Sequence, residues 1–157
     1  MEPSEATEEY IALRAANDRL RQRGLQWFLD AAQELTAQEN SISPLMLQTA
    51  RQEWQFNVGK SVMVGERFGV RFKGKTLLIE LGWPREPEHG FVPGNGLARG
   101  QVSFSLSPIL VEKVTDELIL KPGPNGEPVW FTFVNGKPES VVTRERIRAY
   151  IRRLQDD

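Results

Sequence analysis

Apolar and polar positions alternate most regularly over residues 67–83, and this alternation predicts a β-hairpin. The apolar members of the pattern are Phe68, Val70, Phe72, Leu77, Ile79, Leu81 and Trp83. A period of two is typical of a strand with one buried face. Gly74 and Lys75 interrupt the alternation. A two-residue loop there would pair Phe72 with Leu77 and keep the apolar side chains on one face, and glycine at the first loop position favours a type II′ turn.

The chain before this hairpin has the periodicity of helices. Residues 4–24 carry glutamates near their start and arginines near their end, which is typical of a helix. The apolar stripe of this segment is thin and consists of Tyr10, Leu13, Ala16, Asn17 and Leu20. Residues 25–39 continue the helical pattern, and we favour two helices with a break at Gly24. A Ser-Pro pair typical of a helix start predicts a third, short helix over residues 44–52.

Strand patterns lie on both sides of the hairpin. Apolar residues occupy alternate positions over residues 54–64, which predicts either one long strand or two strands with a bulge at Gly59. A three-residue connection such as residues 65–67 would lead from there into the hairpin. The strands expected later in the chain cover residues 101–107, 117–121, 129–133 and 139–142. Asn135-Gly136 is typical of a tight turn between the last two, and Thr143 is placed to cap a final helix.

These patterns predict an α+β fold in a single domain spanning residues 1–157. We expect N-terminal helices (residues 4–52) to pack on one face of a mainly antiparallel meander sheet of about six strands (residues 53–142). A C-terminal helix (residues 143–155) would close the fold. In an alternative arrangement, a strongly curled sheet grips that C-terminal helix.

Composition narrows the chemistry. The net charge is −1 and there is no cysteine, which excludes disulfides, thiolate catalysis and cysteine-ligated zinc. A charge this close to zero produces no overall field that would attract nucleic acid or an anionic membrane. The apolar runs are too short to cross a bilayer, and the acidic N-terminal segment is unlike a secretory signal. We therefore expect a soluble cytoplasmic protein with no membrane association, no cofactor and no metal.

The long segment over residues 84–100 is the first candidate binding site. Its prolines and glycines predict a loop, and a loop of this length in a compact domain calls for a functional reason. We expect it to be ordered against the body, with Phe91, Val92 and Leu97 turned inward. The residues expected to present a ligand site are Arg85, His89, Arg99 and, at the root of the loop, Trp83. His89 is the only histidine, so a hydrolase that uses it as acid or base is an alternative.

The polar face of the sheet is the second candidate. If the helices cover only one face, the other exposes Arg71, Lys73, Gln101 and Ser103, together with Glu80, Ser105 and Trp130. Such a face can bind a partner, although one face of an antiparallel sheet commonly contacts only water.

The C-terminal helix is the third. Arg144, Arg148 and Arg152 recur every four residues and could contact the phosphates of a nucleic acid. We favour a solvated helix face here and do not expect nucleic acid as a partner.

The chain contains no nucleophile–base motif, metal-ligand cluster or cofactor fingerprint, and we expect no catalytic residues. The sequence favours a non-catalytic binding or protein-interaction module that uses the 84–100 loop and the adjoining sheet face. Its ligand, a protein or a small molecule, and its oligomeric state are left open.

Overall fold

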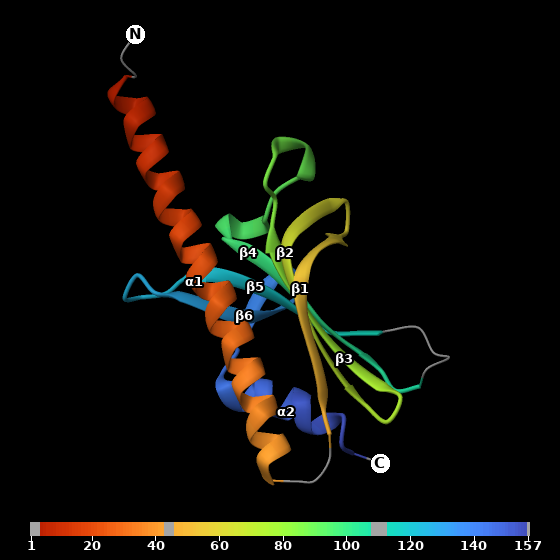
Figure 1. Cartoon of the computed structure of the whole chain (residues 1–157). Coiled ribbons are helices and arrows are strands. Elements are labelled where there is room, and N and C mark those ends of the chain that lie inside the picture. The colour runs from red at the N-terminus through yellow and green to blue at the C-terminus, as the bar shows by residue number, and fades with distance from the viewer. Residues whose placement is uncertain (1–3, 43–45, 108–112, 157) are drawn as a thin grey trace.

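A computed structural model describes residues 4–42, 46–107 and 113–156. Two helices, α1 (Glu5–Ile42) and α2 (Arg144–Arg153), enclose seven strands in the chain order (Figure 1). The strands are β1 (Gln48–Val58), β2 (Ser61–Phe72), β3 (Lys75–Trp83), β4 (Ala98–Ser105), β5 (Lys113–Pro122), β6 (Pro128–Val134) and β7 (Lys137–Val141). Two short 3-10 turns, Pro87–His89 and Pro93–Asn95, lie between β3 and β4.

The strands form one antiparallel meander in the order β1 to β7, which confirms the α+β class and the sheet topology. There are seven strands rather than about six. Gly59, with a φ of 60°, turns the chain so that Val58 pairs with Ser61, and the alternating segment around it becomes the β1–β2 hairpin. The expected connection at residues 65–67 lies inside β2. The third helix over residues 44–52 is wrong, because β1 begins at Gln48; residues 43–45 lie outside the described residues.

The predicted break at Gly24 is also wrong, because α1 is continuous. Gly24 lies at a close approach of the helix to the sheet: a Cβ atom there would come within 2.6 Å of the Leu120 side chain. The Gly24 carbonyl also accepts a hydrogen bond from the Trp130 indole N–H at 2.9 Å. Glycine therefore permits close helix–sheet packing here and does not end the helix.

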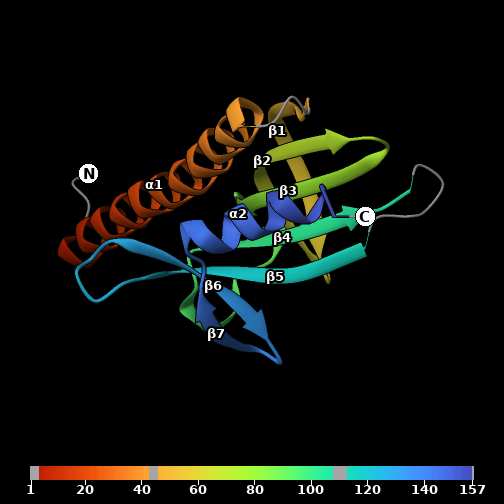
Figure 2. The same cartoon turned by 90° about the horizontal axis from the view of Figure 1, so that it is seen from below.

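Both helices lie against the same face of the sheet (Figure 2). The second half of α1 contributes Phe28, whose ring meets Trp130 edge-on at 5.9 Å. Trp130 is 1% exposed, so its expected place on an open sheet face is wrong. In α2, Ile147 and Ile151 are fully buried in the same core. The two helices lie in one layer, where α2 packs against α1 as well as against the sheet. The alternative arrangement, in which a curled sheet grips the C-terminal helix, is therefore not the one observed.

The β2–β3 hairpin keeps its predicted faces but not its predicted register. Lys73 (φ 47°) and Gly74 (φ 81°) form the turn, so Phe72 pairs with Lys75 rather than with Leu77. Because this register differs from the expected one by two residues, every apolar side chain stays on its predicted face. Positive φ at both central residues is typical of a type I′ turn, not the type II′ turn expected.

The end of the chain follows its prediction more closely. Asn135 and Gly136 have positive φ values of 52° and 76° and form the tight turn between β6 and β7. Thr143 caps α2 by accepting a hydrogen bond from the Arg146 backbone N–H at 3.2 Å. Val142 and Ile147 are both buried on either side of this cap, which is the arrangement of a hydrophobic staple.

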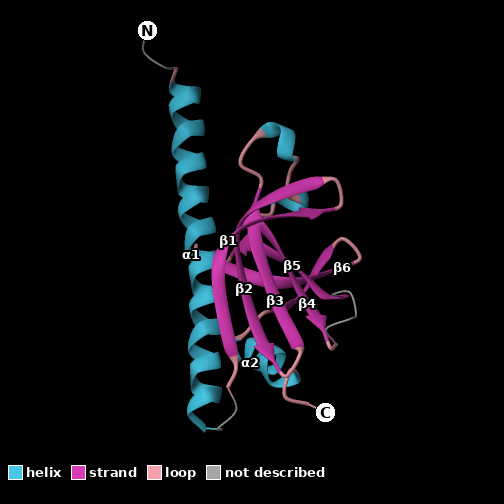
Figure 3. Cartoon of the chain, turned by 45° about the vertical axis from the view of Figure 1, so that its right-hand side comes forward, coloured by secondary structure: helices cyan, strands magenta, loops and turns pink. Residues whose placement is uncertain are grey.

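The first half of α1 extends past the ends of the strands (Figure 3). The fully buried residues of this helix begin at Gly24, Leu20 is partly buried against the core, and residues 5–15 are exposed throughout. We call residues 5–23 the α1 overhang. The loop after β3 covers residues 84–97 rather than the predicted 84–100, because β4 begins at Ala98. It lies beside the α1 overhang, and the two segments line one depression.

Candidate functional site

The loop over residues 84–97 is held against the body, which confirms that part of the prediction. Arg21 Nε donates to the Leu97 carbonyl at 2.7 Å, and the Leu97 N–H donates to the Leu120 carbonyl at 2.7 Å. Leu97 is buried, but Phe91, which was expected to turn inward, is 76% exposed. The loop is therefore anchored at its end and presents an aromatic ring to solvent.

Arg85 lies at the start of this loop and is fixed by two contacts. Its guanidinium stacks on the Trp83 ring at 3.8 Å and donates two hydrogen bonds to the Val64 carbonyl. Burial lowers the pKa of Arg85, while the charge of Asp18 raises it and that of Arg21 lowers it further. These last two residues belong to α1, so the loop and the overhang share one electrostatic environment.

His89 closes the first turn of the loop. Its Nδ1 accepts a hydrogen bond from the Arg85 backbone N–H at 3.2 Å, which places the proton of the neutral ring on Nε2. Nε2 lies 3.9 Å from the Glu86 carboxylate. The histidine thus has a defined role in loop geometry, and neither contact supplies a nucleophile.

Arg99 lies apart from the other predicted site residues. It is buried, its guanidinium lies over the Phe133 ring at 4.5 Å, and its Nε donates to the Leu118 carbonyl. Burial lowers the pKa of Arg99, and the nearby Glu117 opposes this shift. The structure therefore joins Trp83, Arg85 and His89 through direct contacts, whereas Arg99 belongs to the outer face of β4–β6.

The polar sheet face is only partly open. Gln101 donates to Glu80 at 3.0 Å, and both Glu80 and Ser103 are buried. Arg71 and Lys73 are exposed, with Lys73 in the hairpin turn. A polar groove of about 540 Å³ follows β1, β2 and β3 on this side.

The arginines of α2 bind within the chain rather than facing only solvent. The pairs with α1 are Arg144 with Glu34 at 3.5 Å, Arg148 with Gln38 at 3.4 Å and Arg152 with Glu39 at 2.9 Å. The helix face expected to be solvated is thus a row of polar contacts that joins the two helices. These contacts leave less of the arginine face available to an external phosphate.

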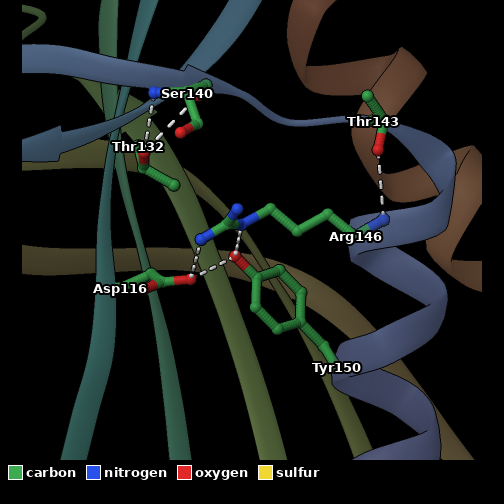
Figure 4. A network of polar contacts seen from close by, with 6 residues as sticks. All are labelled: Asp116, Thr132, Ser140, Thr143, Arg146 and Tyr150. Carbon is green, nitrogen blue, oxygen red and sulfur yellow. Dashed lines mark hydrogen bonds and ion pairs between the residues drawn. The ribbon is translucent and has the colours of Figure 1, made fainter.

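Arg146 belongs to a separate network between α2 and β5 (Figure 4). The Tyr150 hydroxyl donates to Asp116 at 2.5 Å, and Arg146 Nε donates to the Tyr150 oxygen at 3.1 Å. Burial and the hydrogen bond to Asp116 raise the pKa of Tyr150. Each group has a partner, so the network fixes the position of α2.

One feature missed by the sequence reasoning is a groove between the α1 overhang and the loop, which we call the overhang groove. It consists of two adjoining depressions of about 530 and 480 Å³. Both are lined by Tyr10, Arg14, Asn17, Arg21, Pro84 and Arg85. The thin apolar stripe of residues 4–24 was the available signal, but the helix that carries it was expected to pack on the sheet.

A second groove, of about 730 Å³ and mainly apolar, lies between α1 and the β6–β7 region. Trp27, Trp130 and Val141 line it, and the ion pair between Arg23 and Glu127 lies on its rim.

The described ranges contain no group of three or more histidine, aspartate or glutamate residues that could hold a metal ion. Within the same ranges, neither helix combines the length and apolar character needed to span a membrane. The chain matches no family model, no curated protein and no solved structure.

Proposed function

We propose that the protein is a non-catalytic protein-interaction module whose binding surface is the overhang groove. The carrying observation is the exposure of Tyr10 (64%) and Leu13 (61%) on a helix face that is elsewhere buried. Tyr10 precedes Phe28, and Leu13 precedes Ala31, by eighteen residues, which is five helical turns. Each pair points in the same direction from α1, yet only the second member is buried.

The opposite wall of the overhang groove has matching chemistry. Phe91 is exposed on it, and the stack of Arg85 on Trp83 forms its base. Three arginines line the groove against two carboxylates, Asp18 and Glu86. Apolar side chains surrounded by an excess of cations favour a polypeptide segment that carries both apolar residues and carboxylates.

The alternatives have less support. The hydrogen bond of His89 is with its own loop. On the polar sheet face, Glu80 and Ser103 are buried, so this face is only partly open to a ligand. The arginines of α2 contact α1 and β5. In the overhang groove, exposed apolar groups and three cations from distant parts of the chain meet.

Selection of displayed random peptides on the full chain tests this proposal. We expect enriched peptides to combine apolar residues with aspartate or glutamate, and to lose binding to the double variant Tyr10→Ser/Leu13→Ser. Because both side chains are exposed, this variant should fold normally. The matched control is Leu106→Ser/Val114→Ser, which removes two exposed apolar side chains outside the groove and should bind as the wild type does. Enriched peptides that bind the groove variant as tightly as the wild type would overturn the proposal.

A further inference from the structure

We propose that the segment bound in the overhang groove is the α1 overhang of a second copy of this chain, in antiparallel orientation. This inference rests on the proposed function, because it names the partner for the same surface. The required ligand carries apolar residues beside carboxylates. Residues 5–13 of the chain itself have that composition: Glu5, Glu8 and Glu9 stand beside the exposed Tyr10 and Leu13.

Charge along the overhang favours the antiparallel orientation. Residues 5–13 contain three glutamates and no basic residue, a charge of −3. Residues 14–23 contain four arginines, at positions 14, 19, 21 and 23, and one aspartate, Asp18. Their charge is therefore 4 − 1 = +3. An antiparallel pair places each acidic end against the other copy's basic end, whereas a parallel pair places like charges together.

The apolar spacing fits a pair of helices. Tyr10, Leu13, Asn17 and Leu20 follow one another at intervals of three, four and three residues, the spacing of a coiled-coil seam. Antiparallel alignment about a two-fold axis near residue 15 brings Tyr10 opposite the other copy's Leu20. Leu13 then lies opposite Asn17. A seam with one polar position is typical of coiled coils that specify alignment.

The same alignment defines one charged contact on the edge of the seam. Glu9 and Arg23 lie fourteen residues apart on the same edge, and in an antiparallel pair the two positions face each other. Two-fold symmetry produces this contact twice. Arg23 already pairs with Glu127, but both of those side chains are more than half exposed, so Arg23 remains accessible to a second carboxylate.

The position of the body permits this arrangement. The fully buried residues of α1 begin at Gly24, and the first half of the helix extends past the sheet (Figures 1 and 3). An antiparallel pair of overhangs therefore places the two bodies at opposite ends of the helix pair, with Leu20, which is partly buried against the core, at the border of each body. The N-terminal end of each copy then reaches the loop of the other, where Phe91 is exposed. The overhang spans about 28 Å at 1.5 Å per residue, so the interface is small and the dimer should depend on protein concentration.

Sedimentation equilibrium of the full chain with charge-swapped variants tests the proposal. Wild type should show a monomer–dimer equilibrium. Glu9→Lys and Arg23→Glu should each raise the dissociation constant about tenfold or more, since each places like charges together twice. An equimolar mixture of the two variants should recover dimers, because both facing pairs then have opposite charges. Arg19→Glu is the matched control, since it changes the same charge on the outer side of the helix and should have a smaller effect.

The outcomes separate this inference from the proposed function. Recovery in the mixture supports the antiparallel pair; in a parallel pair Glu9 faces Arg14, and Arg23→Glu would have no effect. A dimer unaffected by either variant, or a chain that stays monomeric at every concentration, overturns the second copy as partner. The proposed function survives that result if displayed acidic–apolar peptides still bind and lose binding to Tyr10→Ser/Leu13→Ser. It fails together with the inference if no such peptide is found.

Discussion

The indole N–H of Trp130 donates to the carbonyl of Gly24 at the point where α1 leaves the core. On one side of this contact the helix packs against the sheet, and on the other side it is the overhang. The absence of a side chain at residue 24 is what allows the approach, because Leu120 occupies the space that a Cβ atom would take.

Substitution of Gly24 should therefore destabilise the fold. We expect Gly24→Val to lower the free energy of unfolding by about 1–3 kcal/mol, since the added side chain overpacks the contact with Leu120. Urea unfolding measures the change. The control, Ala12→Val on the exposed part of the same helix, should cost less than about 1 kcal/mol because it changes only helix propensity. Equal effects at the two positions would contradict the role assigned to Gly24.

The β2–β3 turn predicts two opposite effects. Gly74→Val should destabilise the fold by about 1 kcal/mol or more, because a β-branched residue resists a φ of 81°. Lys73→Asn should stabilise it by a few tenths of a kcal/mol, since asparagine tolerates the positive φ that lysine adopts there. Chemical denaturation measures both changes in the free energy of unfolding. A stabilising effect of Gly74→Val would refute the type I′ assignment.

Tyr150 should make stability fall at high pH. Its pKa is raised in the folded state by burial and by the bond to Asp116. The folded state therefore holds the proton more tightly than the unfolded state does. The stabilisation is fully present below the unfolded pKa of about 10 and is lost as the pH rises above it. Unfolding measurements on either side of that pH should show a steeper loss for the wild type than for Tyr150→Phe; parallel pH profiles would contradict it.

The arginine contacts between the helices should contribute modestly. Replacing Arg144, Arg148 and Arg152 together by glutamine should leave the fold intact and cost about 1–2 kcal/mol, since each pair is at least partly exposed. The same variant tests the nucleic-acid alternative. We expect no tight binding of wild type to nucleic acid at physiological salt. Binding that is strong at low salt, weakens steeply with added salt and is absent from the variant would restore that alternative.

Phe91 should matter for binding but not for stability. Its ring is 76% exposed on the loop wall of the overhang groove. Phe91→Ser should leave the unfolding midpoint unchanged within error and weaken the binding of selected peptides, measured by fluorescence anisotropy. Unchanged peptide affinity would show that the loop does not contribute to the binding surface, which would then consist of the α1 overhang only.

The sequence indicated the faces of the elements better than their ends. The alternation of apolar and polar residues placed Val70 and Leu77 in the core. It could not distinguish a turn at residues 73–74 from one at residues 74–75, because both turns keep the same side chains on each face of the sheet. Gly24 was misread for a related reason. A glycine that ends a helix and one that permits close packing look alike until the neighbouring strand is known.

The candidate site was harder to predict, because it depends on apolar side chains that are left exposed by the rest of the fold. Arg85 and His89 contact each other within one loop, as their closeness in sequence indicates, and their role in a ligand site stays a prediction. Tyr10 and Leu13 have the periodicity of core residues, and their exposure depends on how far the sheet extends beneath α1. Sequence periodicity specifies a helix face but not what covers it.

Hydrogen–deuterium exchange of the full chain, measured as a function of protein concentration, tests the central claim most directly. If the α1 overhang and the loop together bind a second copy, amide protection should rise with concentration in residues 5–23 and 84–97 and remain constant in the β5–β7 strands. Concentration-independent exchange in both segments, or new protection confined to the sheet face around Arg71, would contradict the account.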